Sequence, residues 1–221
     1  MKTDVVVSAW KRSTEWTSKF DNERFNVIVY TKNETQPESD TNICKNVGSE
    51  ASTYLKHIVQ NYETLTEKTV FLHDEEFSWH HNGSIIDVVN NSMSYDFFNL
   101  NHYKMNTILN NPVLPLIINC FYKPYLRPYI GEFTKYGDWH IDRKGCAQFV
   151  IHRDVIRSKP KKMYQDLYHW IRTSTLSIDI RYNKLEAYIM EWTWDLIFLA
   201  PICDPSNNEK LEIPKEIKTI D

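Results

Sequence analysis

The residues best suited to chemistry in this 221-residue chain lie in one stretch, residues 69–81, with the sequence TVFLHDEEFSWHH. Its apolar start is followed at once by His73, Asp74, Glu75 and Glu76. Imidazole and carboxylate groups at the end of a strand can bind a divalent metal ion at the edge of a sheet. A solvated acidic turn after a core strand is the alternative, and this segment alone does not separate the two.

Aromatic and imidazole side chains follow the acidic cluster. Phe77 and Trp79 come directly before His80 and His81. The two histidines could add metal ligands, or they could form a hydrogen-bonded structural pair, and both interpretations stay open at this point.

The surrounding elements predict an α/β fold that would position this cluster. Asp4–Ala9 and Asn26–Tyr30 are continuous apolar runs typical of strands buried on both faces, and Thr14–Phe20 between them has helical character. This order of strand, helix and strand favours a parallel sheet. A helix is expected from Ser49 to Tyr62, and Val70–Leu72 supplies a third strand.

The second half of the chain is expected to complete the same domain. Residues 32–41 and 123–142 are predicted to be irregular, and residues 153–158 a turn. Two further strands and two helices are expected, namely a strand between Pro115 and Tyr122, a strand at Cys146–His152, and helices at Pro160–Arg172 and Leu185–Leu199.

Composition excludes several classes of protein. A net charge of −3 and scattered Lys and Arg residues give no reason to expect nucleic acid as a partner. Four widely spaced cysteines argue against a zinc finger or a disulfide scaffold. Neither a secretory signal nor a membrane span is visible, so we expect a cytoplasmic protein, or one in the host cytoplasm if viral. Residues 1–203 are predicted to form one domain, and residues 204–221 a polar tail or a linker into further domains.

Three segments contain residues that could bind a ligand or take part in catalysis, and each follows a predicted strand or begins a predicted helix. They are Ser8–Arg12, the helix entry Asn46-x-Gly48, and His73–Glu76. In a doubly wound sheet ligands bind beyond the carboxyl ends of the strands, so the three could form one site. Lys11 and Arg12 would bring positive charge to a phosphate, and the acidic residues would hold a metal that also contacts it.

These segments resemble a known family. An Asn-x-Gly helix entry followed by a strand ending Phe-Leu-His-Asp-Glu is similar to the first half of GT-A glycosyltransferases, whose strand ends Leu-Asp-x-Asp. The stretches at residues 46–55, 146–149 and 191–198 resemble small glycosyltransferase domains of fungi and large DNA viruses, including those that glycosylate the chlorella virus capsid protein. The resemblance covers residues 4–200. The Asp-x-Asp pair is missing: His73-x-Glu75 lies in its register and Asp74-x-Glu76 in the competing register.

The resemblance implies a GT-A-like, Rossmann-type fold with a mixed, mainly parallel central sheet of about six strands flanked by helices. It also implies Mn²⁺ or Mg²⁺ as cofactor, a UDP-sugar donor, and transfer to a hydroxyl of a glycan or glycoprotein acceptor, in capsid glycosylation. Glu75 is then the first metal ligand expected, with His73 or Asp74 beside it and Glu76 and His140 as further candidates. The residues expected at the nucleotide are Ser8, Ala9, Trp10, Lys11, Arg12, Tyr30, Asn46, Gly48 and Glu50, and those expected at the sugars are Trp79, His80, Trp139 and Gln148.

An inverting transferase also needs a carboxylate base near the acceptor hydroxyl. The candidates are Glu191, Asp138 and Asp195. Glu191 and Asp195 lie four residues apart within the most apolar predicted helix, which suggests that at least one of them points into a site.

Two other functions stay open from the sequence. A metal-dependent hydrolase would use His73, Asp74, His80 and His81. A carbohydrate-binding module would hold a glycan on the aromatic loop at residues 121–140 without needing a nucleotide.

Overall fold

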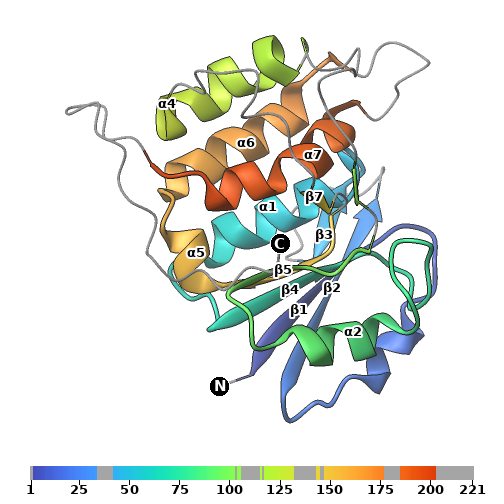
Figure 1. Ribbon diagram of the computed structural model, residues 1–221. Coiled ribbons are helices and arrows are strands. Elements are labelled where there is room, and N and C mark those ends of the chain that lie inside the picture. Colours follow the sequence, from blue (N-terminus) through green and yellow to red (C-terminus); the bar gives the residue numbers. More distant parts are fainter. Residues whose placement is uncertain are drawn as a thin grey trace.

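A computed structural model describes residues 2–33, 42–102, 104–105, 115, 117–131, 143–144, 147–176 and 185–202. Its centre is a six-stranded sheet with the strand order β3-β2-β1-β4-β8-β5, and β6 and β7 form a separate two-stranded sheet (Figure 1). The strands are β1 Thr3–Ala9, β2 Phe25–Asn33, β3 Ile43–Lys45, β4 Lys68–Leu72, β5 Phe97–Asn99, β6 Lys104–Met105, β7 Arg143–Lys144 and β8 Phe149–His152.

The central sheet is mixed. Strand β1 pairs in parallel with β2 and β4, and β2 pairs in parallel with β3. Strand β8 pairs in the antiparallel sense with both β4 and β5, so it alone runs against the other five. The expected α/β fold with a mixed, mainly parallel sheet of six strands and flanking helices is therefore confirmed.

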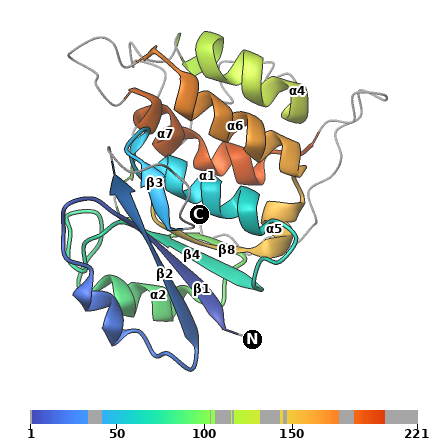
Figure 2. The ribbon, with the colours of Figure 1, turned by 180° about the vertical axis from the view of Figure 1, so that it is seen from behind.

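Helices cover both faces of the sheet. Figures 1 and 2 show α1, α5, α6, α7 and α4 stacked on one face, and α2 with the short η1 helix on the other. The helices are η1 Glu15–Lys19, α1 Ser49–Asn61, α2 Ile85–Ser92, η3 Ile117–Leu126, α4 Arg127–Ile130, α5 Arg153–Arg157, α6 Lys161–Thr173 and α7 Leu185–Leu199. No helix in the described part of the chain is long and apolar enough to cross a membrane.

The apolar runs of the strands supply two cores, one on each face. Side chains alternate along a strand, so Val6 of β1 joins the core beneath α1, α6 and α7, whereas Val5 and Val7 pack with α2. The larger core is rich in aromatic rings: Trp194 of α7 is buried and stacks on Phe198 at 5.5 Å. Burial on both faces explains why these strands read as continuous apolar runs.

The prediction of a strand between Pro115 and Tyr122 is wrong. Described residues from Ile117 onward form a π-type helix that leads into α4, and Phe121 packs on Trp170 of α6 with ring centroids 4.6 Å apart. A short apolar run cannot by itself distinguish a strand from a buried helix. Pro124 lies inside this helix and lacks an N–H donor, which fits the widened hydrogen-bonding pattern.

Two smaller expectations also need correction. Residues 153–158 are not only a turn, because α5 occupies most of them. Strand β2 continues to Asn33, so Lys32 belongs to the sheet and not to a loop. The expectations for residues 34–41, 132–142, Cys146 and the tail at 204–221 lie outside the described residues.

Candidate functional site

A pocket of about 280 Å³ opens at the carboxyl ends of β1, β2 and β4, next to the start of α1. Its position is the one at which doubly wound sheets bind their ligands. Ten residues line it: Ser8, Trp10, Arg12, Lys32, Asn46, Ser49, Glu50, His73, Asp74 and Glu75. The three segments expected to converge do converge, because parallel strands bring their carboxyl ends to one edge.

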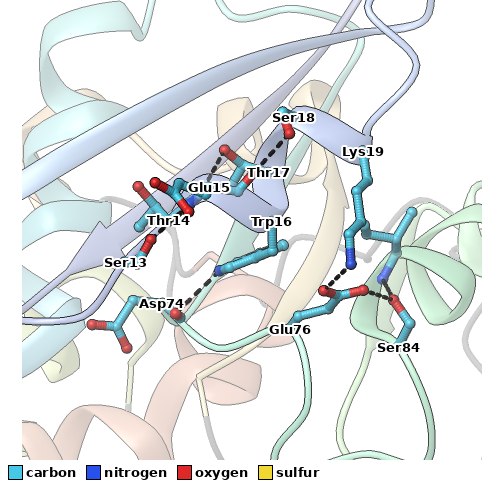
Figure 3. A network of polar contacts seen from close by, with 11 residues as sticks. Ser13, Thr14, Glu15, Trp16, Thr17, Ser18, Lys19, Asp74, Glu76 and Ser84 are labelled. Carbon is cyan, nitrogen blue, oxygen red and sulfur yellow. Dashed lines mark hydrogen bonds and ion pairs between the residues drawn. The ribbon is translucent and has the colours of Figure 1, made fainter.

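Asp74 ties the end of β4 to the segment that follows β1. Its carboxylate accepts a hydrogen bond from the backbone N–H of Trp10 at 2.8 Å. Its backbone carbonyl accepts one from the indole N–H of Trp16 in η1 at 3.2 Å (Figure 3). The segment that follows β1 includes Lys11, whose φ of 60° is uncommon for a residue with a side chain. This wall of the pocket is thus held by contacts between two strand ends.

The carboxylates of Glu75 and Glu76 contact different parts of the protein. Glu75 lines the pocket and forms an ion pair with Arg12, which lines it too. Glu76 instead turns toward η1 and α2: it pairs with Lys19 at 2.6 Å and accepts a hydrogen bond from Ser84 at 3.1 Å (Figure 3). The hydrogen bond from Lys19 lowers the pKa of Glu76. Of the two candidate registers, His73-x-Glu75 is the one of which both residues line the pocket, because Glu76 does not.

His73, which lines the pocket just after β4, packs against a second histidine, His80. The rings of His73 and His80 lie 5.0 Å apart, edge to face, and Nε2 of His73 and Nδ1 of His80 are buried without a hydrogen-bond partner. Burial lowers the pKa of both imidazoles to about 4, so both are neutral at pH 7 and able to bind a metal or accept a proton. His81 also has a buried Nε2 without a hydrogen-bond partner, but its Nδ1 lies 3.1 Å from the carbonyl oxygen of Gly83.

The opposite wall is the entry to α1. Gly48 and Ser49 both have a left-handed backbone, with φ of 59° and 47°. A Cβ atom at position 48 would lie 2.2 Å from Cδ1 of the Ile171 side chain, so glycine lets α1 approach α6 closely. Asn46, Ser49 and Glu50 then line the pocket at a helix N-terminus, where backbone N–H groups favour an anion.

Lys32 is a pocket residue that was missed from the sequence. It is almost fully buried, and its ammonium donates to the Ser52 hydroxyl at 2.5 Å and lies 3.5 Å from the carbonyl of Val47. The alternation of β2 could have revealed it: Lys32 follows Tyr30 by two residues and therefore lies on the same face of the strand. With Arg12 it gives the pocket two cationic side chains.

Several predicted residues do not line this pocket. Gln148 is fully buried beneath it, where its side-chain oxygen accepts from the backbone N–H of His73 at 3.1 Å and its amide donates to Asn101 at 3.2 Å. Nine other described residues that were expected at the site do not line the pocket either, namely Ala9, Lys11, Tyr30, Gly48, Glu76, Trp79, His80, Glu191 and Asp195. Asp138, Trp139 and His140 lie outside the described residues.

The residues on the pocket suit a metal that is shared with a phosphate ligand. Within the described ranges no group of three or more His, Cys, Asp or Glu could hold a metal ion by itself. Magnesium is commonly bound through one or two carboxylates, with substrate phosphates and water completing the shell. Asp74 and Glu75 offer those carboxylates, and the buried, unpartnered Nε2 of His73 is a further donor on the same wall.

A family model described as "Protein of unknown function (DUF3431)" matches residues 5–107 and 131–211. The chain belongs to this DUF3431 family. No curated protein and no solved structure matches the chain. The first matched range of the DUF3431 domain covers β1 from Val5 onward and all of β2, α1 and β4, and it includes all ten residues that line the pocket.

Proposed function

We propose that this DUF3431 protein is a glycosyltransferase that uses a UDP-sugar and a divalent metal, Mn²⁺ or Mg²⁺. The observation that carries the proposal is the composition of the pocket at the carboxyl edge of the sheet. His73, Asp74 and Glu75 line it directly after β4, and Arg12 and Lys32 add positive charge. A nucleoside diphosphate bridged to a metal needs both kinds of group.

The sequence resemblance to GT-A glycosyltransferases supports the same proposal. The likeness rests on the Asn46-x-Gly48 helix entry and on the strand that ends at His73. Both segments border the pocket in a mixed α/β fold. A GT-A fold with this chain's own His73-x-Glu75 in place of Asp-x-Asp is therefore part of the proposal.

The residues of the pocket would divide the work of binding the donor. Arg12 and the N-terminus of α1 would neutralise the diphosphate, and Trp10 would stack on the base or pack beside it. Glu75, Asp74 and His73 would hold the metal, which as a Lewis acid offsets the charge that develops on the leaving diphosphate. Arg12 would leave Glu75 for the phosphate when the donor binds, because their ion pair is exposed and such pairs are weak.

The carboxylate base is proposed among Glu191, Asp195 and Asp138. Glu191 is close enough to influence the buried hydroxyl of Tyr54, whose pKa is raised mainly by burial and further by Glu50, Asp74 and Glu191. Glu50 and Asp74 line the pocket, whereas Glu191 on α7 does not. The acceptor would be a hydroxyl of a glycan, and capsid glycosylation in a host cytoplasm is the setting that the resemblance suggests.

Titration calorimetry with UDP and Mn²⁺ tests the proposal. We expect UDP to bind only with the metal, and Glu75→Gln to lose at least tenfold in affinity, about 1.4 kcal/mol. Glu76→Gln is the matched control, because Glu76 faces Lys19 and should leave the affinity within about threefold. A protein that binds no uridine or guanosine nucleotide-sugar with Mn²⁺ or Mg²⁺ would contradict the proposal.

A carbohydrate-binding module is the second candidate, and the exposed aromatic side chains Phe77 and Trp79 favour it. Glycan binding that persists in EDTA and ignores nucleotides would identify such a module. A hydrolase would need a more complete set of metal ligands than the described residues offer. Turnover of a phosphate ester without a sugar donor, lost in His80→Ala, would identify that activity.

A further inference from the structure

Two large apolar side chains stand exposed beside the pocket. Phe77 is 64% exposed and Trp79 is 65% exposed, and both belong to the loop between β4 and α2. Tyr188 on α7, at 53%, is the third exposed large hydrophobic residue among those described. Phe77 and Trp79 are two residues apart in this loop, and exposed apolar side chains gathered in one segment can mark a binding surface, because leaving them in water is unfavourable.

The loop that carries these rings is anchored to the pocket. The Trp79 ring lies on the His80 ring with centroids 3.9 Å apart, and His80 packs edge to face on His73, which lines the pocket. The backbone carbonyl of His80 also accepts the N–H of His102 at 2.8 Å. A continuous row of rings therefore joins the pocket wall to the exposed face of Trp79.

The charges around the rings are balanced. Of the carboxylates that precede Phe77 in the loop, Glu75 is paired with Arg12 and Glu76 with Lys19. Such a surface offers little to a strongly charged ligand. It is also far smaller than the roughly 800 Å² per partner of a standard protein–protein interface, because two side chains make it up.

A pyranose ring matches this surface in size and chemistry. One face of many pyranoses carries C–H groups with partial positive charge, which suit the negative face of an indole ring. The hydroxyl groups at the edge of the sugar stay in water or reach polar neighbours such as Ser78 and Asn82, which flank the aromatic residues in the loop.

We propose that Trp79, with Phe77 beside it, is a platform for an uncharged pyranose of the acceptor glycan. The sugar rests on the indole face and directs a hydroxyl toward the pocket wall at His73. The inference rests on the proposed function and deepens it, because it places the glycan acceptor on a named side chain and makes the sugar that binds there an uncharged pyranose. Trp79 is a binding residue here and takes no part in proton transfer.

Saturation-transfer NMR on the full chain tests the platform, with UDP and Mn²⁺ present and methyl glycosides of glucose, galactose, xylose and rhamnose as probes. We expect at least one glycoside to bind the wild-type protein, and Trp79→Ala to lower the affinity for that glycoside at least tenfold. Phe77→Ala should weaken it less. Tyr188→Ala removes another exposed ring, on α7, and should leave glycoside binding unchanged.

The affinity for UDP and Mn²⁺ is measured on the same variants and separates the two proposals. It should stay within twofold of wild type in Trp79→Ala, because Trp79 does not line the pocket. The platform is overturned if UDP binds but no glycoside does, or if Trp79→Ala binds glycosides as wild type does. Glycoside binding that depends on Trp79 in a protein that never binds UDP would uphold the platform and overturn the transferase.

Discussion

At the scale of the residue, Gln148 shows how the pocket wall is held from below. It comes directly before β8, and its side chain reaches across to the backbone N–H of His73 just after β4. Its amide then donates to Asn101, whose own amide contacts the carbonyl of Gln148 at 3.3 Å. A buried amide with both ends occupied fixes the position of a backbone more firmly than an apolar side chain can.

Gln148→Leu should therefore destabilise the protein by about 2 kcal/mol, because it leaves the N–H of His73 and the oxygen of Asn101 buried without a partner. Urea unfolding at pH 7 measures the change. Gln60→Leu on the exposed side of α1 is the matched control and should stay within about 0.5 kcal/mol of wild type. Equal losses in the two variants would show that the buried contacts do not matter.

The same contact links stability to binding. Because Gln148 positions His73, the affinity of Gln148→Leu for UDP with Mn²⁺ should fall severalfold, although Gln148 does not line the pocket. An unchanged affinity in a destabilised variant would show that Gln148 contributes to stability and not to UDP binding.

At the scale of the element, the position of α1 depends on one glycine. Gly48 combines a left-handed backbone with the lack of a Cβ atom at the contact with Ile171 of α6. Helix α1 packs against both α6 and α7, so a shift at its start would reach the pocket and the larger core together. Sequence spacing located this helix, but the close contact with α6 explains why its entry needs glycine.

Gly48→Ala should cost more than backbone strain alone, because the new methyl group would meet Ile171, which is buried. Gly83→Ala is the matched control: it has a similar φ of 77° but open space around the new Cβ. We expect the free energy of unfolding, measured in urea, to fall by about 1 kcal/mol in Gly83→Ala and by at least about 2 kcal/mol in Gly48→Ala. Indistinguishable losses would mean that Ile171 moves aside without cost.

At the scale of the whole molecule, the packing of helices on the sheet buries an imidazole away from the pocket. His57 of α1 lies in the interior, where its Nδ1 contacts the hydroxyl of Tyr30 at 3.2 Å. Burial lowers the pKa of His57 to about 4 from its ordinary 6.5. The folded protein thus favours neutral His57 over a range in which the unfolded chain is already protonated.

Folding stability should consequently fall as the pH drops from about 6.5 toward 4, since the unfolded state binds the proton first. For His57 alone the loss between pH 7 and pH 5 is roughly 2 kcal/mol. Urea unfolding at both pH values measures it, and His57→Gln should show a smaller difference between them than wild type. His73, His80 and His81, whose pKa values burial also lowers, contribute to the pH dependence that remains in the variant. The same pH difference in variant and wild type would contradict the assignment.

The local pattern of residues determines the position of most helices and strands without reference to tertiary contacts. Apolar runs predicted β1, β2 and β4, and the spacing of apolar residues predicted α1, α6 and α7, because burial repeats with the period of the element. Since parallel strands end at a common edge, the sequence also predicted that Ser8–Arg12, Asn46–Gly48 and His73–Glu76 would meet.

Only the tertiary structure decided which of those side chains share the pocket. It turned Glu75 toward Arg12 and Glu76 toward Lys19, a choice set by partners that lie tens of residues away in the chain. It also placed Lys32 on the pocket, Gln148 beneath His73, and β8 against the direction of its neighbours. Periodicity reports whether a side chain is buried, but it does not report what the side chain faces, because that depends on contacts between distant segments.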